Sequence, residues 1–363
     1  MLKFIYLSLF TIVPVISGLE VNESCTTPYN APGKCVPSRQ CPYVIKIIRK
    51  PNSSFKDGIY LEKSKCGVMT GPRPIPLTCC PALLNPEQCG VPALANRIIG
   101  GEPTKLEEHP WAALLVFDVG GEKFAPKCGA SLLNSRFVLT AAHCIVDVPK
   151  KWTLHRVRFS EVDALSEDDC ATINDEDVCR QEYEIESVTV HENYDRNKMN
   201  RQHDIALIKL KEPVVFSEYV RPICVPIDDT IRALPIDDEE FTVTGWGQTE
   251  TQTRSGQQLH VEIFGKTNEV CNKVYAVANI TLEKTHICVG GTKNKDSCKG
   301  DSGGPLMRQF EGIWYQSGIV SFGARFCGSE GFPGIYTNVA EYIDWMTEVV
   351  NDSHVDPEMS EEE

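Results

Sequence analysis

Short apolar stretches dominate the chain from Arg97 onward. The clearest are WAALLVF, SRFVLTA, HDIALIKL, FTVTGW and YQSGIVSF, which are separated by Gly, Pro and Asp residues that favour turns. Many short strands over roughly 250 residues predict an all-β domain built from β-barrels. The stretch VAEYIDWMTEVV differs, because its apolar residues recur every three or four positions, at Val339, Ile343, Met346 and Val350. This period predicts a helix at the end of the domain.

The two ends of the chain have a different character. Residues 1–18 hold one lysine and then an apolar run that is too short to span a bilayer and ends in small residues, which predicts a cleaved signal peptide. No second apolar run is long enough for a membrane helix, so we expect a secreted, extracellular protein that does not bind membranes. Residues 351–363 hold six acidic residues and no Lys or Arg, which is typical of a solvated, disordered tail.

Cysteine is concentrated near the N-terminus. Residues 25–80 contain six cysteines and many prolines but few apolar runs, and so small a segment needs covalent cross-links. The chain has 16 cysteines in all, an even number that fits an oxidising compartment. Four Asn-x-Ser/Thr triplets agree with export and are candidate glycosylation sites, at Asn22, Asn52, Asn279 and Asn351.

The net charge of −14 is unevenly distributed. Residues 161–186 contain eleven acids and one Arg, whereas residues 19–96 contain nine Lys and Arg against five Asp and Glu. A general nucleic-acid-binding face is therefore not expected. The mild positive balance of the N-terminal segment permits an acidic partner without establishing one.

Three motifs carry residue types that suit nucleophilic catalysis. TAAHC contains His143, HDIALIKL contains Asp204, and GDSGGP contains Ser302. A neutral serine hydroxyl is a weak nucleophile, so it needs a base to take its proton and an acid to orient that base. Each motif alone is weak evidence, since a lone histidine beside a cysteine is more often a packing residue or a metal ligand. The chain order His, Asp, Ser differs from that of subtilisins and α/β-hydrolases.

Together the motifs resemble the three signatures of chymotrypsin-type serine proteases, and the resemblance covers residues 98 to about 350. It implies a chymotrypsin-like double β-barrel that needs no cofactor for catalysis. His143 would be the general base, Asp204 would orient its imidazole, and Ser302 would attack the substrate carbonyl. The backbone N–H groups of Gly300 and Ser302 would form the oxyanion hole.

The resemblance also implies activation by cleavage at the sequence NRIIGG. A cut after Arg97 would free the amino group of Ile98, which in this family pairs with the acid before the nucleophile, here Asp301. Because a buried carboxylate without its partner is costly, the uncut chain is expected to be a zymogen with a poorly formed site. Since Arg97 is itself basic, activation by another copy of the enzyme is a further hypothesis.

Asp296 resembles the acid at the floor of the primary specificity pocket of trypsin-like members. Gly323 and Gly334 match the two wall positions that stay small, so we expect cleavage after Arg or Lys. The alternative is that Asp296 is a solvated loop acid. Phe322 departs from the tryptophan usual at its position, which leaves the neighbouring subsites undefined.

The early cysteines, which end in the adjacent pair Cys79 and Cys80, resemble the clip domain that precedes protease domains in arthropod haemolymph cascades. The expected segments are a signal peptide (1–18), a clip domain (25–80), a linker with the activation site (81–97), a protease domain (98–350) and an acidic tail (351–363). The resemblance implies the disulfides Cys25–Cys79, Cys35–Cys66, Cys41–Cys80, Cys89–Cys224, Cys128–Cys144, Cys271–Cys288 and Cys298–Cys327. The bond to Cys89 would keep the light chain attached after cleavage.

The acidic stretch EVDALSEDDC has a spacing that resembles a calcium loop of clip proteases. Calcium prefers several oxygen ligands, both carboxylate and carbonyl. The candidate ligands are Glu161, Asp163, the carbonyl of Ser166, and Asp169. The alternative is a solvated acidic loop closed by a Cys170–Cys179 disulfide.

The resemblance implies a trypsin-like endopeptidase zymogen of haemolymph innate immunity, including melanization. Its substrate would be prophenoloxidase, a cytokine precursor or another protease zymogen, its activator an upstream protease and its inhibitor a serpin. Two alternatives stay open. A non-catalytic homologue that acts as a binding cofactor usually lacks the nucleophile, whereas this chain keeps Ser302, and a digestive protease gains little from a tethered clip domain.

Overall fold

The computed structural model describes residues 18–21, 23–28, 32–49, 55–70, 72–81, 84–86, 88–92, 106–121, 123–166, 170–173, 176–248, 255–293, 297–298, 300–323 and 328–352. These residues form two compact units, the first from residues before 83 and the second from residues 83–353. None of the helices in these ranges is long and apolar enough to cross a membrane.

The first unit is a small antiparallel sheet with two helices. Its strands lie in the order β1-β2-β4-β3 and span Ser24–Thr26 (β1), Pro32–Pro37 (β2), Lys65–Met69 (β3) and Ile75–Pro81 (β4). A 3-10 turn, Ser38–Gln40 (η1), leads into the helices Pro42–Arg49 (α1) and Phe55–Lys63 (α2). Its small core contains Val44, Ile47 and Tyr60, and three disulfides cross it: Cys25–Cys79, Cys35–Cys66 and Cys41–Cys80.

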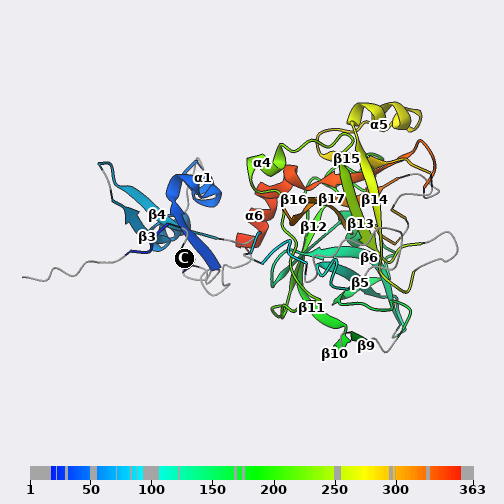
Figure 1. Cartoon of the computed structure of the whole chain (residues 1–363), viewed down its shortest axis with the longest axis horizontal. Helices are drawn as coiled ribbons and strands as arrows, with labels where there is room; N and C mark the ends of the chain where they lie inside the picture. The colour runs from blue at the N-terminus through cyan, green and yellow to red at the C-terminus, as the bar shows by residue number, and fades with distance from the viewer. Residues whose placement is uncertain are drawn as a thin grey trace, which may run out of the picture. The chain divides into compact units, whose positions relative to one another are not determined.

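The second unit contains two closed β-barrels of six strands each among its described residues (Figure 1). The first barrel has the order β11-β12-β7-β6-β5-β8, with strands Ala112–Asp118 (β5), Phe124–Leu132 (β6), Phe137–Thr140 (β7), Thr153–Phe159 (β8), Gln181–Val190 (β11) and Ala206–Leu210 (β12). The second has the order β13-β14-β15-β18-β17-β16, with strands Glu240–Gly245 (β13), Leu259–Lys266 (β14), His286–Gly290 (β15), Pro305–Phe310 (β16), Ile313–Phe322 (β17) and Pro333–Asn338 (β18). The predicted barrel architecture is confirmed.

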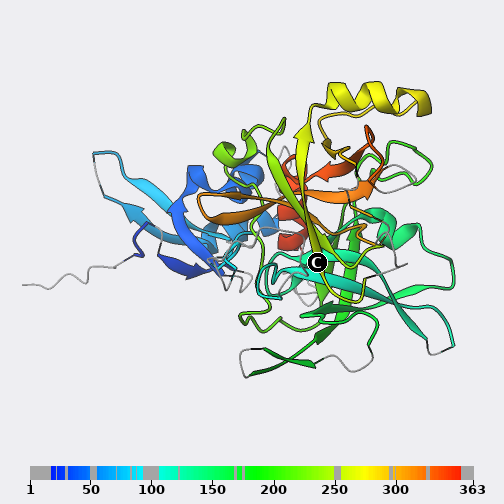
Figure 2. The same cartoon turned by 45° about the vertical axis from the view of Figure 1, so that its right-hand side comes forward.

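Short helices and one hairpin connect these strands. The hairpin of Cys170–Ile173 (β9) and Glu176–Cys179 (β10) is closed by the Cys170–Cys179 disulfide. The helices are Ala142–Val146 (α3), Asp229–Arg232 (α4) and Asn268–Tyr275 (α5), and a 3-10 turn, Ala276–Ala278 (η2), follows α5. Helix α5 lies at the outer end of the second barrel in both views (Figure 2).

The predicted C-terminal helix is present. Its first turn is a 3-10 turn, Val339–Tyr342 (η3), and the α-helix proper is Ile343–Asp352 (α6). The apolar residues that predicted it, Val339, Ile343, Met346 and Val350, are all buried. Trp345 of the same helix contacts His191 and Glu192, which directly follow β11 of the first barrel. Burial of the apolar face stabilises the helix more than its intrinsic propensity does.

The segment around Cys89 belongs to the second unit and is bonded covalently to the rest of it. Cys89 forms a disulfide with Cys224. The Asn85 side chain bonds both backbone groups of Val225, since its Oδ1 accepts the N–H at 2.7 Å and its Nδ2 donates to the carbonyl at 2.8 Å. Gly90 has a φ of 69°, and a Cβ there would lie 2.4 Å from the Trp314 carbonyl. Glycine is therefore required at this close approach.

Candidate active site

His143 and Asp204 form a hydrogen-bonded pair in the first barrel. His143 lies in α3, directly after β7, and Asp204 comes two residues before β12, the strand that pairs with β7. The Nδ1 atom of His143 is 2.7 Å from Asp204 Oδ2, and the His143 backbone N–H donates to Asp204 Oδ1 at 2.8 Å. A carboxylate can only accept, so Nδ1 carries the proton and Nε2 is left as the basic nitrogen.

The Asp204 carboxylate is completely buried, yet the structure favours its charged form. Burial by itself raises the pKa of Asp204. The neighbouring His143 imidazole and hydrogen bonds from His143 and from Ser321 Oγ outweigh this effect, so the pKa of Asp204 lies below its usual value. Asp204 is therefore ionised at neutral pH and can stabilise a positively charged imidazole.

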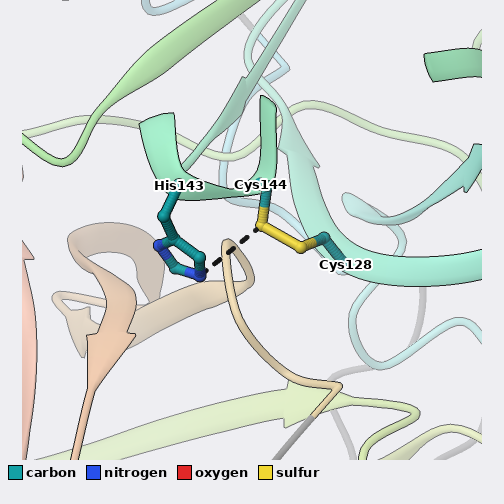
Figure 3. Close-up of side chains that lie close together, drawn as sticks. All are labelled: Cys128, His143 and Cys144. Atoms are coloured by element: carbon teal, nitrogen blue, oxygen red, sulfur yellow. Dashed lines mark hydrogen bonds between the residues drawn. A yellow bond between two sulfur atoms is a disulfide. The ribbon is translucent and has the colours of Figure 1, made fainter. Parts of the chain in front are cut away.

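A disulfide lies beside the His143 ring (Figure 3). Cys144 follows His143 in α3 and bonds to Cys128 of β6, with its Sγ 3.8 Å from His143 Nε2. The three side chains are close enough to resemble a metal cluster. Both sulfurs are already oxidised, however, and a disulfide does not supply the thiolates that a metal site needs. The disulfide instead fixes α3, and with it the His143 ring, to strand β6.

Ser302 lies in a tight turn between two glycines with left-handed backbone, Gly300 (φ 105°) and Gly303 (φ 81°). A Cβ at Gly303 would lie 2.3 Å from Thr140 Oγ1 and 2.6 Å from the Gly129 carbonyl oxygen. Only glycine fits there. The Ser302 carbonyl accepts the Gly129 N–H at 2.8 Å, so the turn from the second barrel is held against β6 of the first.

Asp301 turns its side chain away from Ser302 and towards β13. Its Oδ1 accepts the Gly247 N–H at 2.8 Å, and its Oδ2 accepts the Cys298 N–H at 2.9 Å. Gly245 and Gly247 make room for the carboxylate, because a Cβ at Gly247 would lie 2.4 Å from Oδ2. These contacts hold Asp301 in the uncut chain, while Arg97 and Ile98 lie outside the described residues.

The two glycines expected to line a pocket face each other. Gly323 follows β17 and Gly334 lies in β18, and a Cβ on Gly323 would be 3.6 Å from the Cα of Gly334. Phe322, which stands where tryptophan was expected, packs edge-on against Tyr275 at a centroid distance of 6.0 Å. Asp296 lies outside the described residues.

In the acidic loop, two of the candidate calcium ligands contact arginines. Glu161 is fully buried, and its Oε2 is 3.3 Å from Arg158 Nη1. The Ser166 carbonyl accepts a hydrogen bond from Arg180 Nη1 at 3.2 Å. The carboxylate of Asp163 accepts the N–H of Leu165 at 3.0 Å. Asp169 lies outside the described residues.

The remaining expected sites are described in part. Cys298 is disulfide-bonded, and its expected partner Cys327 lies outside the described residues. The structure also forms the Cys271–Cys288 disulfide. Asn279 follows η2 as its C-cap in a left-handed conformation and is exposed. Asn351 lies in the last turn of α6, and Asn22 and Asn52 lie outside the described residues.

Two residues that donate hydrogen bonds to Asp204 were not predicted from the sequence. Ser321 donates its hydroxyl to Asp204 Oδ2, and Thr337 Oγ1 donates to the Asp204 carbonyl at 2.8 Å. Ser321 directly precedes Phe322 and Gly323, so its place in that motif was an available signal. Thr337 gave no such signal, because threonine is common in strands whether or not it has a functional role.

Comparison with known proteins identifies two matching families. Residues 98–346 match the family described as Trypsin, and residues 25–80 match the family described as Regulatory CLIP domain of proteinases. Each range falls in one of the two compact units of the structure.

Similar proteins match over most of their length. The chain is 50% identical to CLIP domain-containing serine protease B15 of Anopheles gambiae, over 92% of both chains. It is 36% identical to phenoloxidase-activating factor 3 of Holotrichia diomphalia, over 93% of this chain and 97% of the relative. A solved structure, the Grass clip serine protease of the Toll pathway of Drosophila, is similar with a TM-score of 0.64 and 30% identity, and covers 92% of this chain and 98% of its own.

Proposed function

Because the chain belongs to the clip-domain serine endopeptidases of the chymotrypsin family, we propose that it is a secreted zymogen whose active form cleaves protein substrates after Arg or Lys. The observation that carries the proposal is the buried His143–Asp204 pair, in the same unit as the glycine-flanked Ser302 turn. Proteases of this family need no cofactor for catalysis.

The residues act in a fixed sequence. His143 Nε2 takes the proton from the Ser302 hydroxyl as its oxygen attacks the scissile carbonyl, and Asp204 stabilises the imidazolium that forms. The backbone N–H groups of Gly300 and Ser302 stabilise the negative oxygen of the tetrahedral intermediate. His143 then returns the proton to the leaving amine, and water releases the acyl group by the same steps in reverse order.

We assign substrate selection to Asp296, which resembles the acid of the primary specificity pocket in trypsin-like proteases, with Gly323 and Gly334 as the pocket walls. Replacing Asp296 with asparagine should lower kcat/KM for an Arg-ended chromogenic peptide by about 100-fold, because the substrate cation would be desolvated without its partner. The exposed acid Glu330 offers a matched control, and Glu330→Gln should leave kcat/KM unchanged. An Asp296→Asn enzyme that still cleaves Arg peptides at the original rate would assign specificity elsewhere.

The physiological role proposed is a step in an extracellular innate-immune cascade. One relative is named as a phenoloxidase-activating factor and another as a protease of the Toll pathway, which supports a protease zymogen, prophenoloxidase or a cytokine precursor as substrate. Mixing the active enzyme with each candidate and sequencing the new N-termini would identify it. An upstream protease that cuts after Arg97 and a serpin inhibitor complete the proposal.

We also propose that the acidic loop binds calcium. The carboxylates of Glu161 and Asp163 and the carbonyl of Ser166 are the ligand types that Ca²⁺ prefers. Arg158 and Arg180 now contact two of these ligands, so an ion would have to displace them.

Calcium at about a hundredfold excess over Kd should stabilise the protein by about 2.7 kcal/mol. This is a rise of about 5 to 10 °C in the thermal midpoint measured by calorimetry. Asp163→Asn should remove the rise, whereas Asp177→Asn in the adjacent hairpin should keep it. A midpoint that does not respond to calcium or to chelator would favour the solvated acidic loop.

A further inference from the structure

Arg201 places a cation beside the catalytic groups. It lies on the loop between β11 and β12, three residues before Asp204, with a left-handed backbone (φ 45°) and a partly buried side chain. Its Nη1 donates to the carbonyl of Ser321 at 3.0 Å. Ser321 in turn donates its hydroxyl to Asp204. Ser321 therefore bonds both the Arg201 guanidinium and the catalytic Asp204 carboxylate.

The Ser321 carbonyl accepts a hydrogen bond from Arg201 and lies at a bulge near the end of β17. Strand β17 pairs with β18 at Val320 and Phe322, and a bulge between them leaves Ser321 out of the register. Two residues further on, Gly323 faces Gly334 at the expected pocket wall. Strand β16 pairs with β17 only as far as Ile319. A substrate whose basic side chain enters the pocket can therefore run along the end of β17 on that side, as extended peptides do beside unpaired strand segments. Its preceding residues would then reach Arg201.

Arg201 differs from the other arginine of its loop in its electrostatic partners. Arg196 pairs with Asp147, with Nε 3.4 Å from Oδ1. Within the described parts of the chain no ion pair joins Arg201 to a carboxylate, although the protein carries a net charge of −14. A guanidinium has five N–H donors, so the contact with one backbone carbonyl leaves donors for a second, charged acceptor.

We propose that Arg201 selects substrates that carry Asp or Glu one or two residues before the cleaved Arg or Lys. The guanidinium binds the substrate carboxylate. Its Nη1 either keeps its hydrogen bond to the Ser321 carbonyl or gives it up to the substrate. The inference rests on the proposed function, because it needs a basic residue in the pocket between Gly323 and Gly334. It adds an acidic residue to the recognition sequence of that site.

The activation segment of this chain offers a comparison. The residues VPALAN that precede Arg97 contain no acid. Arg201 therefore makes this chain a poor substrate for its own active form, and a protease with different requirements has to supply the first cut.

The test uses the full-length protein after cleavage at Arg97, with the peptides acetyl-Ala-X-Arg and acetyl-X-Ala-Arg 4-nitroanilide, where X is Glu, Gln or Lys. In at least one series kcat/KM for the Glu peptide should exceed that for the Gln peptide by about tenfold, because a hydrogen bond between charged groups changes affinity by roughly this factor. The Lys peptide should have the lowest kcat/KM. Arg201→Ala should bring Glu and Gln within about twofold of each other, and Arg201→Glu should make Lys the best, as expected from charge complementarity.

The control variant is Arg196→Ala, which should keep the preference for Glu. Arg201→Lys keeps the positive charge and should therefore keep part of the preference for Glu. This result would show that the loss in Arg201→Ala comes from the missing charge and not from misfolding. Equal rates for all three peptides in the unmodified enzyme would overturn the role of Arg201 while leaving the preference for Arg intact. No turnover of any Arg peptide would instead overturn the proposed function itself.

Discussion

Replacing Ser302 with alanine should reduce turnover of an Arg-ended peptide on the order of 10⁶-fold, the scale measured when the nucleophile of a related triad is removed. The reason is that alanine lacks the oxygen that attacks the carbonyl, while His143 and Asp204 remain paired at 2.7 Å without a hydroxyl to activate. The measurement is kcat of the protein after cleavage at Arg97, at peptide concentrations well above KM.

The matched control is Ser187→Ala, which removes an exposed serine hydroxyl from β11 and should leave turnover unchanged. Binding of an Arg-containing competitive inhibitor should persist in Ser302→Ala, since the pocket walls are not altered. Retention of more than about one per cent of the activity by Ser302→Ala would exclude Ser302 as the nucleophile.

Cleavage after Arg97 should raise kcat/KM for the same peptide by about 10³-fold or more. The new Ile98 amino group would pair with Asp301 and order the Ser302 turn, and loss of even one oxyanion donor costs about 10²- to 10³-fold in turnover. In the uncut chain Asp301 is held by the backbone N–H groups of Gly247 and Cys298. The carboxylate must exchange these contacts, or share them, when the ammonium group arrives.

An Asp301→Asn variant should remain slow even after cleavage, because the amide cannot form the ion pair. Glu218→Gln, which neutralises an exposed acid of the same unit, should activate normally. Equal rates before and after the cut would contradict the zymogen mechanism. A fast Asp301→Asn enzyme would contradict only the role of the carboxylate.

Local patterns in the sequence predicted strands β5, β7, β12, β13 and β17 and the C-terminal helix, but not helices such as α1, α2 and α5. The runs WAALLVF and HDIALIKL contain strands β5 and β12, because strand formation follows from apolar residues and flanking turns. The register between strands was not predictable. Pairings such as β12 with β7 and β13 with β16 join residues far apart in the chain, and they depend on closure of the whole barrel.

The same distinction applies to the candidate site. His143, Asp204 and Ser302 stood out because each lies in a motif whose residue types suit one chemical step. Residues that act through contacts alone did not stand out. Ser321 lies 117 residues from Asp204 in the sequence. The glycines that admit the Asp301 side chain, at the end of β13 and just after it, had no visible role before its carboxylate was placed beside them.

After the proposed cut at Arg97, the Cys89–Cys224 bond would keep the two pieces of the chain together on dilution. Two pieces held together by noncovalent contacts would separate once their concentration in a body fluid fell below their Kd. Here the portion that carries the first unit stays at a fixed effective concentration next to the catalytic unit, whatever the volume. Any partner bound by the first unit would therefore remain tethered to the same enzyme molecule, until the bond is reduced or the chain between the first unit and Cys89 is cut.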